Sequence, residues 1–198
     1  MKIVVASSNK GKIKEIINLL PEFEILPYSD LMDSFEIEES GVTFKENAII
    51  KANAVYEKLK DKDEYIVIAD DSGISIEALD FRPNIYSARF AGINATDKDN
   101  LNKACEELKK LNVKSSKAYY TASIAIIYKG NVYTTHGWMH GDVIDRAIGE
   151  NGFGYDPMFI PDGFDKTLGE LEDSVKKDLS HRSIALNLAK IIINNLKC

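Results

Sequence analysis

The sequence contains few cysteines and no long apolar run. Two of its 198 residues are cysteine, Cys105 and Cys198, which is too few for a disulfide framework, and their spacing does not suit a metal site. No apolar stretch approaches the roughly 20 residues that a membrane span needs, and the apolar run after Met1 is too short for a signal peptide. We therefore expect a soluble, cytoplasmic protein with no membrane partner.

The chain also lacks an excess of positive charge. It carries 31 acidic and 25 basic residues, a formal net charge of -6, which argues against a broad binding surface for nucleic acid. A few local lysines could still hold a small phosphate ligand. Because 44% of the residues are hydrophobic, the chain can bury a core of ordinary size. We expect residues 1–198 to form a single domain of two lobes, without an independent linker.

The stretch YIVIADDSG, from Tyr65 to Gly73, joins a buried strand to two carboxylates. Asp70 and Asp71 follow five residues of strand character, and Ser72-Gly73 indicates a turn after them. Carboxylates at the end of a core strand favour metal or phosphate chemistry. Acidic residues beside a glycine are also ordinary turn formers, so this stretch alone leaves both interpretations open.

The N-terminal segment has the pattern of a phosphate-binding loop. A strand at Lys2 to Ala6 leads through the polar loop Ser7 to Lys12 into a helix that Pro21 ends. Backbone N–H groups at the start of a helix can bind phosphate. The loop is not a Walker A motif, because Ala6 replaces its first glycine and Ile13 replaces its magnesium-binding hydroxyl. Any metal ligands must lie elsewhere, and an ordinary turn with solvated lysines is the alternative.

A second helix is predicted after Thr43, which forms a capping box with Glu46. Its apolar stripe consists of Phe44, Ala48, Ala52, Val55 and Leu59. Lys51 falls on or beside this stripe and leans toward the helix start, near Glu39. It is either a snorkelling side chain or a cation held over a phosphate site.

Parallel strands would bring these pieces together. In right-handed β-α-β connections the loops after successive strands lie at one edge of the sheet. We therefore expect Ser7 to Lys12, Glu38-Glu39 and Asp70-Asp71 to converge. Lysines and backbone amides opposite carboxylates are what a magnesium-nucleotide site requires.

The second half of the chain offers a hairpin, a glycine-rich loop and a C-terminal helix. A long strand from Ala118 to Tyr128 and the turn Lys129-Gly130-Asn131 predict the hairpin. The loop NGFGYDP, Asn151 to Pro157, could hold a flat ligand against Phe153, or it could be pinned by its own aromatic residues. The final helix follows Ser180-His181-Arg182, and its inner side is expected at Ile184, Leu188, Ile191 and Ile192.

Six segments together resemble the inosine triphosphate pyrophosphatase family, in the family's order and over residues 2 to about 190. They are SSNKGKIKE, EESGVTFKENAIIKA, ADDSGISIEAL, IYSARFAG, NGFGYDPMFIP and LSHRSIAL. The resemblance implies a mixed α/β fold, largely a central twisted sheet flanked by helices, in two lobes with a cleft between them. It also implies a homodimer that uses Mg²⁺ to hydrolyse ITP, dITP and XTP to the monophosphate and pyrophosphate.

The resemblance also implies roles for individual residues. The triphosphate loop corresponds to Ser7, Ser8, Asn9, Lys10, Gly11 and Lys12, with Asn9 and Lys12 in direct contact. Glu39 and Asp71 correspond to the magnesium-associated carboxylates. Asp71 also corresponds to the proton acceptor, which Asp70 would assist, while Lys51 and Ser72 correspond to substrate contacts near the phosphates.

At the other end of the substrate, the loop for base and sugar corresponds to Phe153, Gly154, Tyr155 and Asp156. The residues at the base and its 6-oxo group correspond to Lys176, His181 and Arg182. Two positions depart from the family pattern: Ser7-Ser8-Asn9 stands where Thr-Gly-Asn is usual, and Ile148-Gly149 where Arg-Gly is frequent.

Two alternatives remain open from the sequence. A house-cleaning pyrophosphatase of related fold would act on modified pyrimidines or methylated bases. A non-enzymatic phospho-acceptor receiver domain would use the aspartate pair and a lysine, but its acidic pair typically follows the first strand, where this chain has Ser7-Ser8-Asn9.

Overall fold

The computed structural model describes residues 2–196, so Cys198 lies outside the described residues. The strands are β1 (Lys2–Val5), β2 (Glu24–Pro27), β3 (Tyr65–Ile76), β4 (Ser115–Tyr128), β5 (Asn131–Ile144) and β6 (Phe159–Pro161). The α-helices are α1 (Lys10–Leu19), α2 (Phe44–Tyr56), α3 (Asp97–Lys110), α4 (Asp173–Leu179) and α5 (His181–Asn195). Short 3-10 turns are η1 (Tyr28–Asp30), η2 (Lys62–Glu64), η3 (Glu77–Leu79), η4 (Asn84–Arg89) and η5 (Asp156–Met158).

The strands of residues 2–196 form one mixed sheet in the order β2-β1-β3-β4-β5-β6. Strand β1 runs parallel to both of its neighbours, with Val5 opposite Pro27 and Ile68. Strand β6 pairs antiparallel with β5. The predicted central α/β sheet is therefore confirmed, as are the parallel strands on which the convergence of the loops depends.

The chain divides into two compact units. Unit 1 comprises residues 2–71, 122–137 and 182–196, and unit 2 comprises residues 72–121 and 138–181. Strands β3, β4 and β5 contribute residues to both units, and one boundary falls between Asp71 and Ser72 and another between His181 and Arg182. The expectation of a single domain without an independent linker stays a prediction.

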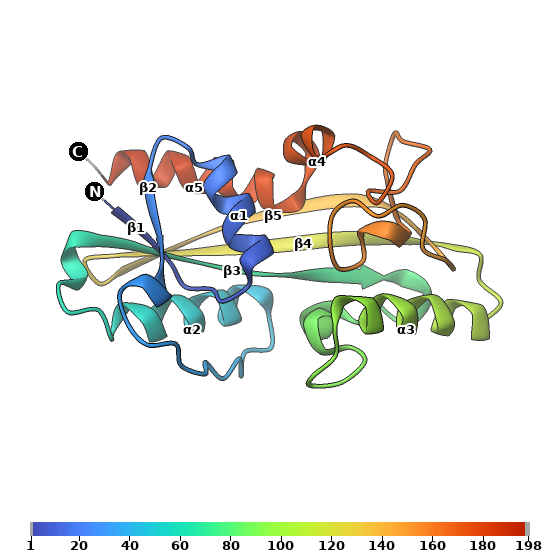
Figure 1. Cartoon of the computed structure of the whole chain (residues 1–198), viewed down its shortest axis with the longest axis horizontal. Helices are drawn as coiled ribbons and strands as arrows, with labels where there is room; N and C mark the ends of the chain where they lie inside the picture. The colour runs from blue at the N-terminus through green and yellow to red at the C-terminus, as the bar shows by residue number, and fades with distance from the viewer. Residues whose placement is uncertain (1, 197–198) are drawn as a thin grey trace. The chain divides into compact units, whose positions relative to one another are not determined.

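Unit 1 has helices on both faces of its strands (Figure 1). Helices α1 and α5 cover one face, where Ile16, Leu186 and Ile193 pack against the apolar side chains of β1 and β3. Helix α2 covers the other face with Ala48, Ala52 and Val55 of the predicted stripe. Phe44 and Leu59 are buried as well, although Leu59 lies beyond the end of α2. The two faces follow from the period of two along a strand, because Ile66 and Ile68 face α1 and α5 whereas Val67 and Ala69 face α2.

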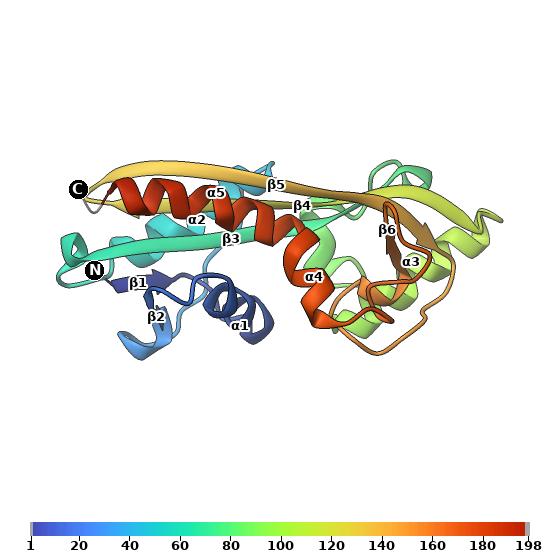
Figure 2. The ribbon, with the colours of Figure 1, turned by 90° about the horizontal axis from the view of Figure 1, so that it is seen from above.

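Figure 2 shows α5 running beside the β4–β5 hairpin in unit 1. The Thr135 hydroxyl donates a hydrogen bond of 2.8 Å to the carbonyl of Ala185 there. The hairpin turn is confirmed at Lys129 and Gly130, which both have positive φ angles, 47° and 75°, as a two-residue turn between twisted strands requires.

Unit 2 has a core of its own. Helix α3 begins with a capping box, in which Thr96 and Asp99 exchange hydrogen bonds, and it packs Leu101, Ala104 and Leu108 against β3, β4 and β5. Cys105 belongs to this core, where burial raises the pKa of its thiol. It is therefore a small packing residue and not a reactive thiol.

The turn predicted at Ser72-Gly73 is wrong. Strand β3 continues through both residues to Ile76, so Asp70 and Asp71 lie within a strand and not at its end. A side chain at Gly73 would collide with Ser87, whose Oγ accepts a hydrogen bond of 2.9 Å from the N–H of Ile74. The glycine at this position therefore permits the close approach of η4.

The inner side predicted for the C-terminal helix is wrong at three of its four positions, while Ile192, the fourth, is partly buried and packs against the core. Ile184, Leu188 and Ile191 are 39%, 46% and 60% exposed, and the buried face of α5 instead consists of Ala185, Leu186, Ala189 and Ile193. The small alanines let α5 lie close to the sheet, which turns the larger side chains outward. No helix within residues 2–196 is long and apolar enough to cross a membrane.

Candidate active site

The first polar cluster starts at the loop after β1. Ser7 Oγ accepts a hydrogen bond of 3.2 Å from the N–H of Asn9, and Asn9 Oδ1 caps α1 by accepting one of 3.1 Å from the N–H of Lys12. Ser8, Asn9 and Lys10 are exposed. The loop thus presents hydroxyl, amide and ammonium groups at the N-terminus of a ten-residue helix, where the helix dipole favours an anion.

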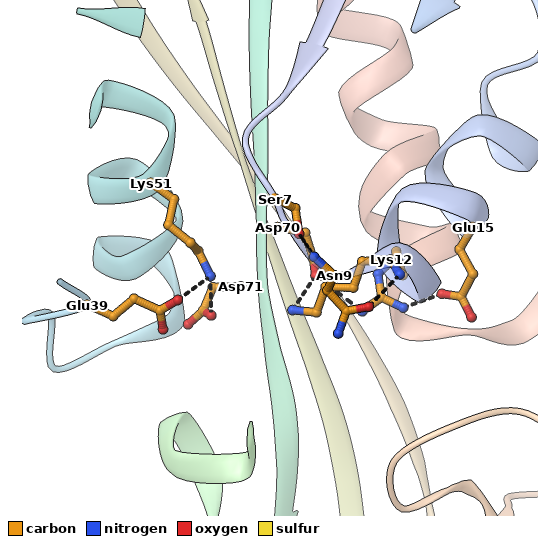
Figure 3. A network of polar contacts seen from close by, with 9 residues as sticks. Ser7, Asn9, Lys12, Glu15, Glu39, Lys51, Asp70 and Asp71 are labelled. Atoms are coloured by element: carbon orange, nitrogen blue, oxygen red, sulfur yellow. Dashed lines mark hydrogen bonds and ion pairs between the residues drawn. The ribbon is translucent and has the colours of Figure 1, made fainter. Parts of the chain in front are cut away.

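Asp70 lies on the α1 and α5 side of β3 and is fully buried (Figure 3). Its Oδ2 is 2.8 Å from Lys12 Nζ and accepts a hydrogen bond of 3.2 Å from Arg182 Nη2. Arg182 is itself 1% exposed and pairs through Nη1 with Glu15 of α1. This cluster ties the phosphate-loop helix to the strand and to the start of α5.

The charges of this cluster determine its protonation. Burial alone would raise the pKa of Asp70, but Arg182 and Lys12 outweigh it and hold that pKa far below its usual range. Burial lowers the pKa of Lys12 although Asp70 opposes the shift. Arg182, between two carboxylates, has a raised pKa despite its burial. Asp70 is therefore a permanent anion, and it is not poised to accept a proton near neutral pH.

Asp71 lies on the opposite, α2 side of the same strand (Figure 3). Its Oδ1 accepts a hydrogen bond of 2.7 Å from Lys51 Nζ, which also lies 3.1 Å from Glu39 Oε1. Lys51 therefore leans inward toward the start of α2, as predicted, and the snorkelling alternative is excluded. The two aspartates that are adjacent in sequence belong to different clusters, because neighbouring residues of a strand face opposite ways.

Asp71 differs from Asp70 in its proton affinity. Burial raises the pKa of the Asp71 carboxyl, and Lys51 and Lys12 only partly offset that effect. Burial lowers the pKa of Lys51, but Asp71 and Glu39 outweigh it, so the Lys51 pKa is raised and the ammonium stays charged. Asp71 is thus the carboxylate with the greater affinity for a proton, the property that a general base needs.

The segment that carries Glu39 is fixed to the start of α2. The N–H of Gly41 donates a hydrogen bond of 2.9 Å to Asn47 Oδ1, and a side chain at Gly41 would lie 2.7 Å from that same oxygen. Thr43 caps the helix as predicted, but Glu46 accepts from the N–H of Val42, which differs from the reciprocal capping box. These contacts hold Glu39 beside Lys51.

Glu39 and Asp71 are the residues that fit a divalent cation. Asp71 Oδ2 is a buried oxygen without a hydrogen-bond partner among the described residues, and both carboxylates lie against one ammonium. Within residues 2–196 no group of three His, Cys, Asp or Glu side chains could hold a metal. Mg²⁺ typically takes one or two carboxylates and completes its shell with water and phosphate oxygens, which agrees with this pair.

A second polar cluster lies in unit 2, around Asp156. This carboxylate is 3% exposed. Its Oδ2 accepts hydrogen bonds of 2.7 Å from Lys176 Nζ and 2.9 Å from the N–H of Phe153, and its Oδ1 accepts one of 3.1 Å from the hydroxyl of Tyr120. Asp156 therefore binds its own loop and Lys176, as a buried carboxylate must to offset its lost hydration.

The glycines of this loop have two different roles. A side chain at Gly152, where φ is 75°, would collide with the carboxylate of Asp156, so the loop can close around Asp156 only with glycine there. A side chain at Gly154 would meet no atom within 4 Å, but its φ of 62° favours glycine. Phe153, between them, is half-buried, with Lys176 Nζ 4.5 Å from its ring centroid.

The side chain of Tyr155 points into the core of unit 2. Its hydroxyl donates a hydrogen bond of 2.8 Å to the carbonyl of Ser87, and burial raises its pKa. Any substrate contact of Tyr155 would have to come from its backbone. The ring of His181 stacks on that of Tyr120, with centroids 4.7 Å apart and an angle of 6° between the planes.

Comparison with known proteins gives a consistent result. The model of the Ham1 family matches residues 3–191. The chain belongs to the Ham1 family. It is 62% identical to a dITP/XTP pyrophosphatase of Nautilia profundicola, over 99% of each chain. It is 56% identical to one of Sulfurimonas denitrificans, over 99% of this chain and all of the relative. The solved structure of the Staphylococcus aureus Ham1 protein is 37% identical, with a TM-score of 0.85 over 98% of this chain and 99% of that one.

The sequence-predicted residues of this Ham1-family chain fall into two sets. Unit 1 holds Ser7 to Lys12, Glu39, Lys51 and Asp71. Ion pairs join Lys12 to Asp70 on one face of β3, and Lys51 to Glu39 and Asp71 on the other face. Unit 2 holds Ser72, the loop from Phe153 to Asp156, Lys176 and His181. Arg182 does not join its neighbour His181, because its guanidinium pairs with Asp70 and Glu15 in unit 1.

Three residues of this Ham1-family site were missed from the sequence. Glu15 lies one helical turn after Lys12, a spacing that could have indicated its role. Asn47 precedes Lys51 by four residues on α2, which gives the same kind of signal. Tyr120 carries no local signal, since its partners Asp156 and His181 are distant in sequence.

Proposed function

We propose that this protein hydrolyses the non-canonical purine nucleoside triphosphates dITP, XTP and ITP to the monophosphate and pyrophosphate, and so removes them from the nucleotide pool. The names of its Ham1-family relatives support this proposal. The observation that carries it is the pairing of Glu39 and Asp71 around Lys51, with one Asp71 oxygen unpartnered among the described residues.

The triphosphate is assigned to the residues of unit 1. The amides at the start of α1, together with Asn9 and Lys12, bind phosphate oxygens. The positive charge of these groups offsets the negative charge of the triphosphate. Lys51 donates to Glu39 and Asp71, and it can turn to a phosphate oxygen when these carboxylates hold a cation. Arg182 keeps Asp70 ionised and α1 in place.

A divalent cation, taken here to be Mg²⁺, would be held by Glu39 and Asp71 and would supply charge neutralisation on the triphosphate. Asp71 accepts a proton from the attacking water. The water oxygen then forms a bond to the α-phosphorus while the bond from that phosphorus to the bridging oxygen breaks. Pyrophosphate leaves with the electron pair of that bond, and the nucleoside monophosphate remains. Positioning and charge supply most of the rate in such phosphoryl transfers.

The base is assigned to the residues of unit 2. The half-buried ring of Phe153 offers a stacking surface, and Lys176 and His181 offer hydrogen-bond donors for a 6-oxo group. A 6-amino group would bring a donor to a donor and leave buried groups unpaired. Such mismatches lower kcat/KM by up to about 10⁴-fold to 10⁵-fold, so dATP and ATP should be poor substrates.

The test is a nucleotide panel with separate detection of pyrophosphate and orthophosphate. The proposal expects pyrophosphate from dITP, XTP and ITP in the presence of Mg²⁺, and little turnover of ATP or modified pyrimidine triphosphates. Orthophosphate as the sole product, or equal turnover of ATP, would contradict it. Preference for a modified pyrimidine would favour the related house-cleaning pyrophosphatase instead. The receiver-domain alternative finds no support, because the chain belongs to the Ham1 family.

Three further parts of the proposal follow from the family resemblance. Mg²⁺ is expected to be required, which chelation and re-addition of the metal would test. A homodimer is expected, which light scattering would test. The cytoplasmic location stays a prediction.

A further inference from the structure

Tyr120 contacts both Asp156 and His181, two residues that the family resemblance assigns to the base and sugar. It lies on β4 in unit 2 and is 6% exposed. Its hydroxyl donates to Asp156 Oδ1 at 3.1 Å, and its ring stacks on the imidazole of His181. A third contact, with Phe159 at a centroid distance of 4.8 Å, fixes the ring from another direction. The tyrosine is therefore held rigidly against both partners.

The hydroxyl acts on a carboxylate that has several protein donors. Asp156 receives the Tyr120 hydroxyl on Oδ1, and it receives Lys176 Nζ and the N–H of Phe153 on Oδ2. Removal of one donor from a buried carboxylate leaves more of its charge to be offset by the remaining partners. The place and direction of the Lys176 ammonium thus depend on Tyr120 through Asp156.

The ring acts on His181. The two ring planes are within 6° of parallel, and such a stack limits rotation of the imidazole about its side-chain torsions. His181 is the first residue of α5, so its backbone is fixed by the helix while its ring is fixed by Tyr120. A hydrogen-bond donor that reads a base must be held in direction as well as in place.

We infer that Tyr120 is a positioning residue for base selection, which orients His181 by stacking and Lys176 through Asp156. This inference rests on the proposed function, in which Lys176 and His181 bind the 6-oxo group. The contacts of Tyr120 that carry this inference, with Asp156 and His181, lie in unit 2. Loss of Tyr120 therefore weakens recognition of 6-oxo purines and leaves the chemical step in place.

Two substitutions separate the two contacts. Tyr120→Phe keeps the ring and removes the hydroxyl, and it should raise the KM for dITP about tenfold, the typical effect of losing a hydrogen bond to a charged group. Tyr120→Leu removes both contacts and should raise that KM further. In both variants kcat for dITP should stay within about threefold of the wild type, since the transition-state contacts to phosphate are unchanged.

Tyr119→Phe is the matched control. Tyr119 is the preceding residue of β4 and faces the other side, with its ring 6.3 Å from Phe81 and 5.7 Å from His140. It loses the same hydroxyl from the same strand, and it should leave the KM for dITP unchanged. Inhibition by inorganic triphosphate tests the phosphate residues alone and should be equal in the wild type and all three variants.

The outcomes distinguish the inference from the proposed function. If the wild type prefers dITP over dATP and Tyr120→Phe keeps the same KM and the same preference, the inference is wrong while the proposed function stands. If Tyr120→Phe raises the KM for dITP and for dATP and weakens inhibition by triphosphate to the same extent, Tyr120 has a general structural role and the inference is again wrong. If the wild type shows no preference for 6-oxo purines, the proposed function falls, and the inference falls with it.

Discussion

The polar clusters of the two units are built differently. Unit 1 sets Lys12, Lys51 and Arg182 against Glu15, Glu39, Asp70 and Asp71 in ion pairs. Unit 2 sets one buried carboxylate, Asp156, against Lys176 and surrounds the pair with the rings of Tyr120, Phe153 and His181. A triphosphate is highly charged and a purine is flat and uncharged. The charged groups of unit 1 therefore suit a triphosphate, and the rings and hydrogen-bond donors of unit 2 suit a flat purine base.

A second contrast lies inside unit 1, between two adjacent residues. Asp70 and Asp71 occupy opposite faces of β3, and each has a lysine of its own (Figure 3). Asp70 also has Arg182, which with Lys12 keeps the pKa of Asp70 low, whereas burial raises the pKa of Asp71 although Lys51 opposes that shift. Asp70 is therefore expected to serve structure and Asp71 to serve chemistry.

The largest effect is expected from Asp71→Asn. The amide cannot accept the proton of the attacking water, so kcat/KM for dITP should fall roughly a thousandfold, within the range for loss of general acid–base catalysis. The melting temperature should change little, because burial disfavours the charged form of Asp71 and Lys51 retains Glu39 as a partner. Pyrophosphate release and thermal unfolding measure the two quantities.

Asp33→Asn is the control for that variant, since Asp33 is an exposed aspartate of unit 1. It should match the wild type in both measurements. An Asp71→Asn protein that kept most of its turnover would remove Asp71 from the chemistry.

Asp70→Asn should have the opposite effect to Asp71→Asn, with a larger loss of stability than of catalysis. It takes the carboxylate away from a guanidinium that is 1% exposed, and breaking a buried ion pair in this way typically costs about 3 to 5 kcal/mol of unfolding free energy. Urea unfolding measures this loss. A variant as stable as the wild type would show that the remaining pair of Arg182 with Glu15 is sufficient.

The stability difference between wild type and Asp70→Asn should depend on pH. The pKa of Asp70 is held far below its usual range in the folded protein, whereas an unfolded aspartate titrates near about 3.9. The contribution of Asp70 to the free energy of unfolding is therefore complete above the pKa of the unfolded aspartate. It declines as the pH falls below that value, because the unfolded chain then binds the proton. Urea unfolding of both proteins in metal-free buffer from pH 6 to pH 3 should show the difference shrinking in acid. A constant difference would contradict the assigned ionisation.

The smallest effect is expected in unit 2, from Phe153→Leu. Loss of a stacking ring that leaves an apolar side chain should raise the KM for dITP about three- to tenfold and leave kcat nearly unchanged. Phe164→Leu is its control, because Phe164 is a 40% exposed phenylalanine of the same unit. An equal effect of the two substitutions on KM would remove Phe153 from base binding.

Much of the fold could be predicted because local patterns agree with it. The parallel strands, the cap at Thr43 and the turn at Lys129-Gly130 follow from strand character, a capping residue and glycine. The prediction of a turn at Ser72-Gly73 was wrong, because the glycine there allows Ser87, which is distant in sequence, to approach the strand closely. The inner face predicted for α5 was wrong at Ile184, Leu188 and Ile191, because Ala185, Leu186, Ala189 and Ile193 occupy the positions against the sheet.

The candidate site could be predicted in its residue types but not in its pairing. Helical and strand spacing placed Lys51 inward and brought Glu39, Lys12 and the aspartates together. The opposite directions of His181 and Arg182 could not be foreseen, because they depend on partners on β3, β4 and α1. Long-range packing, which a local pattern does not encode, decides these contacts.

The division of roles between the two units has one direct test. It is the ratio of kcat/KM for dITP to kcat/KM for dATP in the wild type, Lys12→Met and Lys176→Met. Our account predicts that Lys12→Met lowers kcat/KM for both substrates by a similar factor and keeps their ratio within about twofold, since phosphate contacts are common to all nucleotides. Lys176→Met should lower the ratio about tenfold or more, because it removes a donor to the 6-oxo group. A ratio that collapses in Lys12→Met and survives in Lys176→Met would contradict the account.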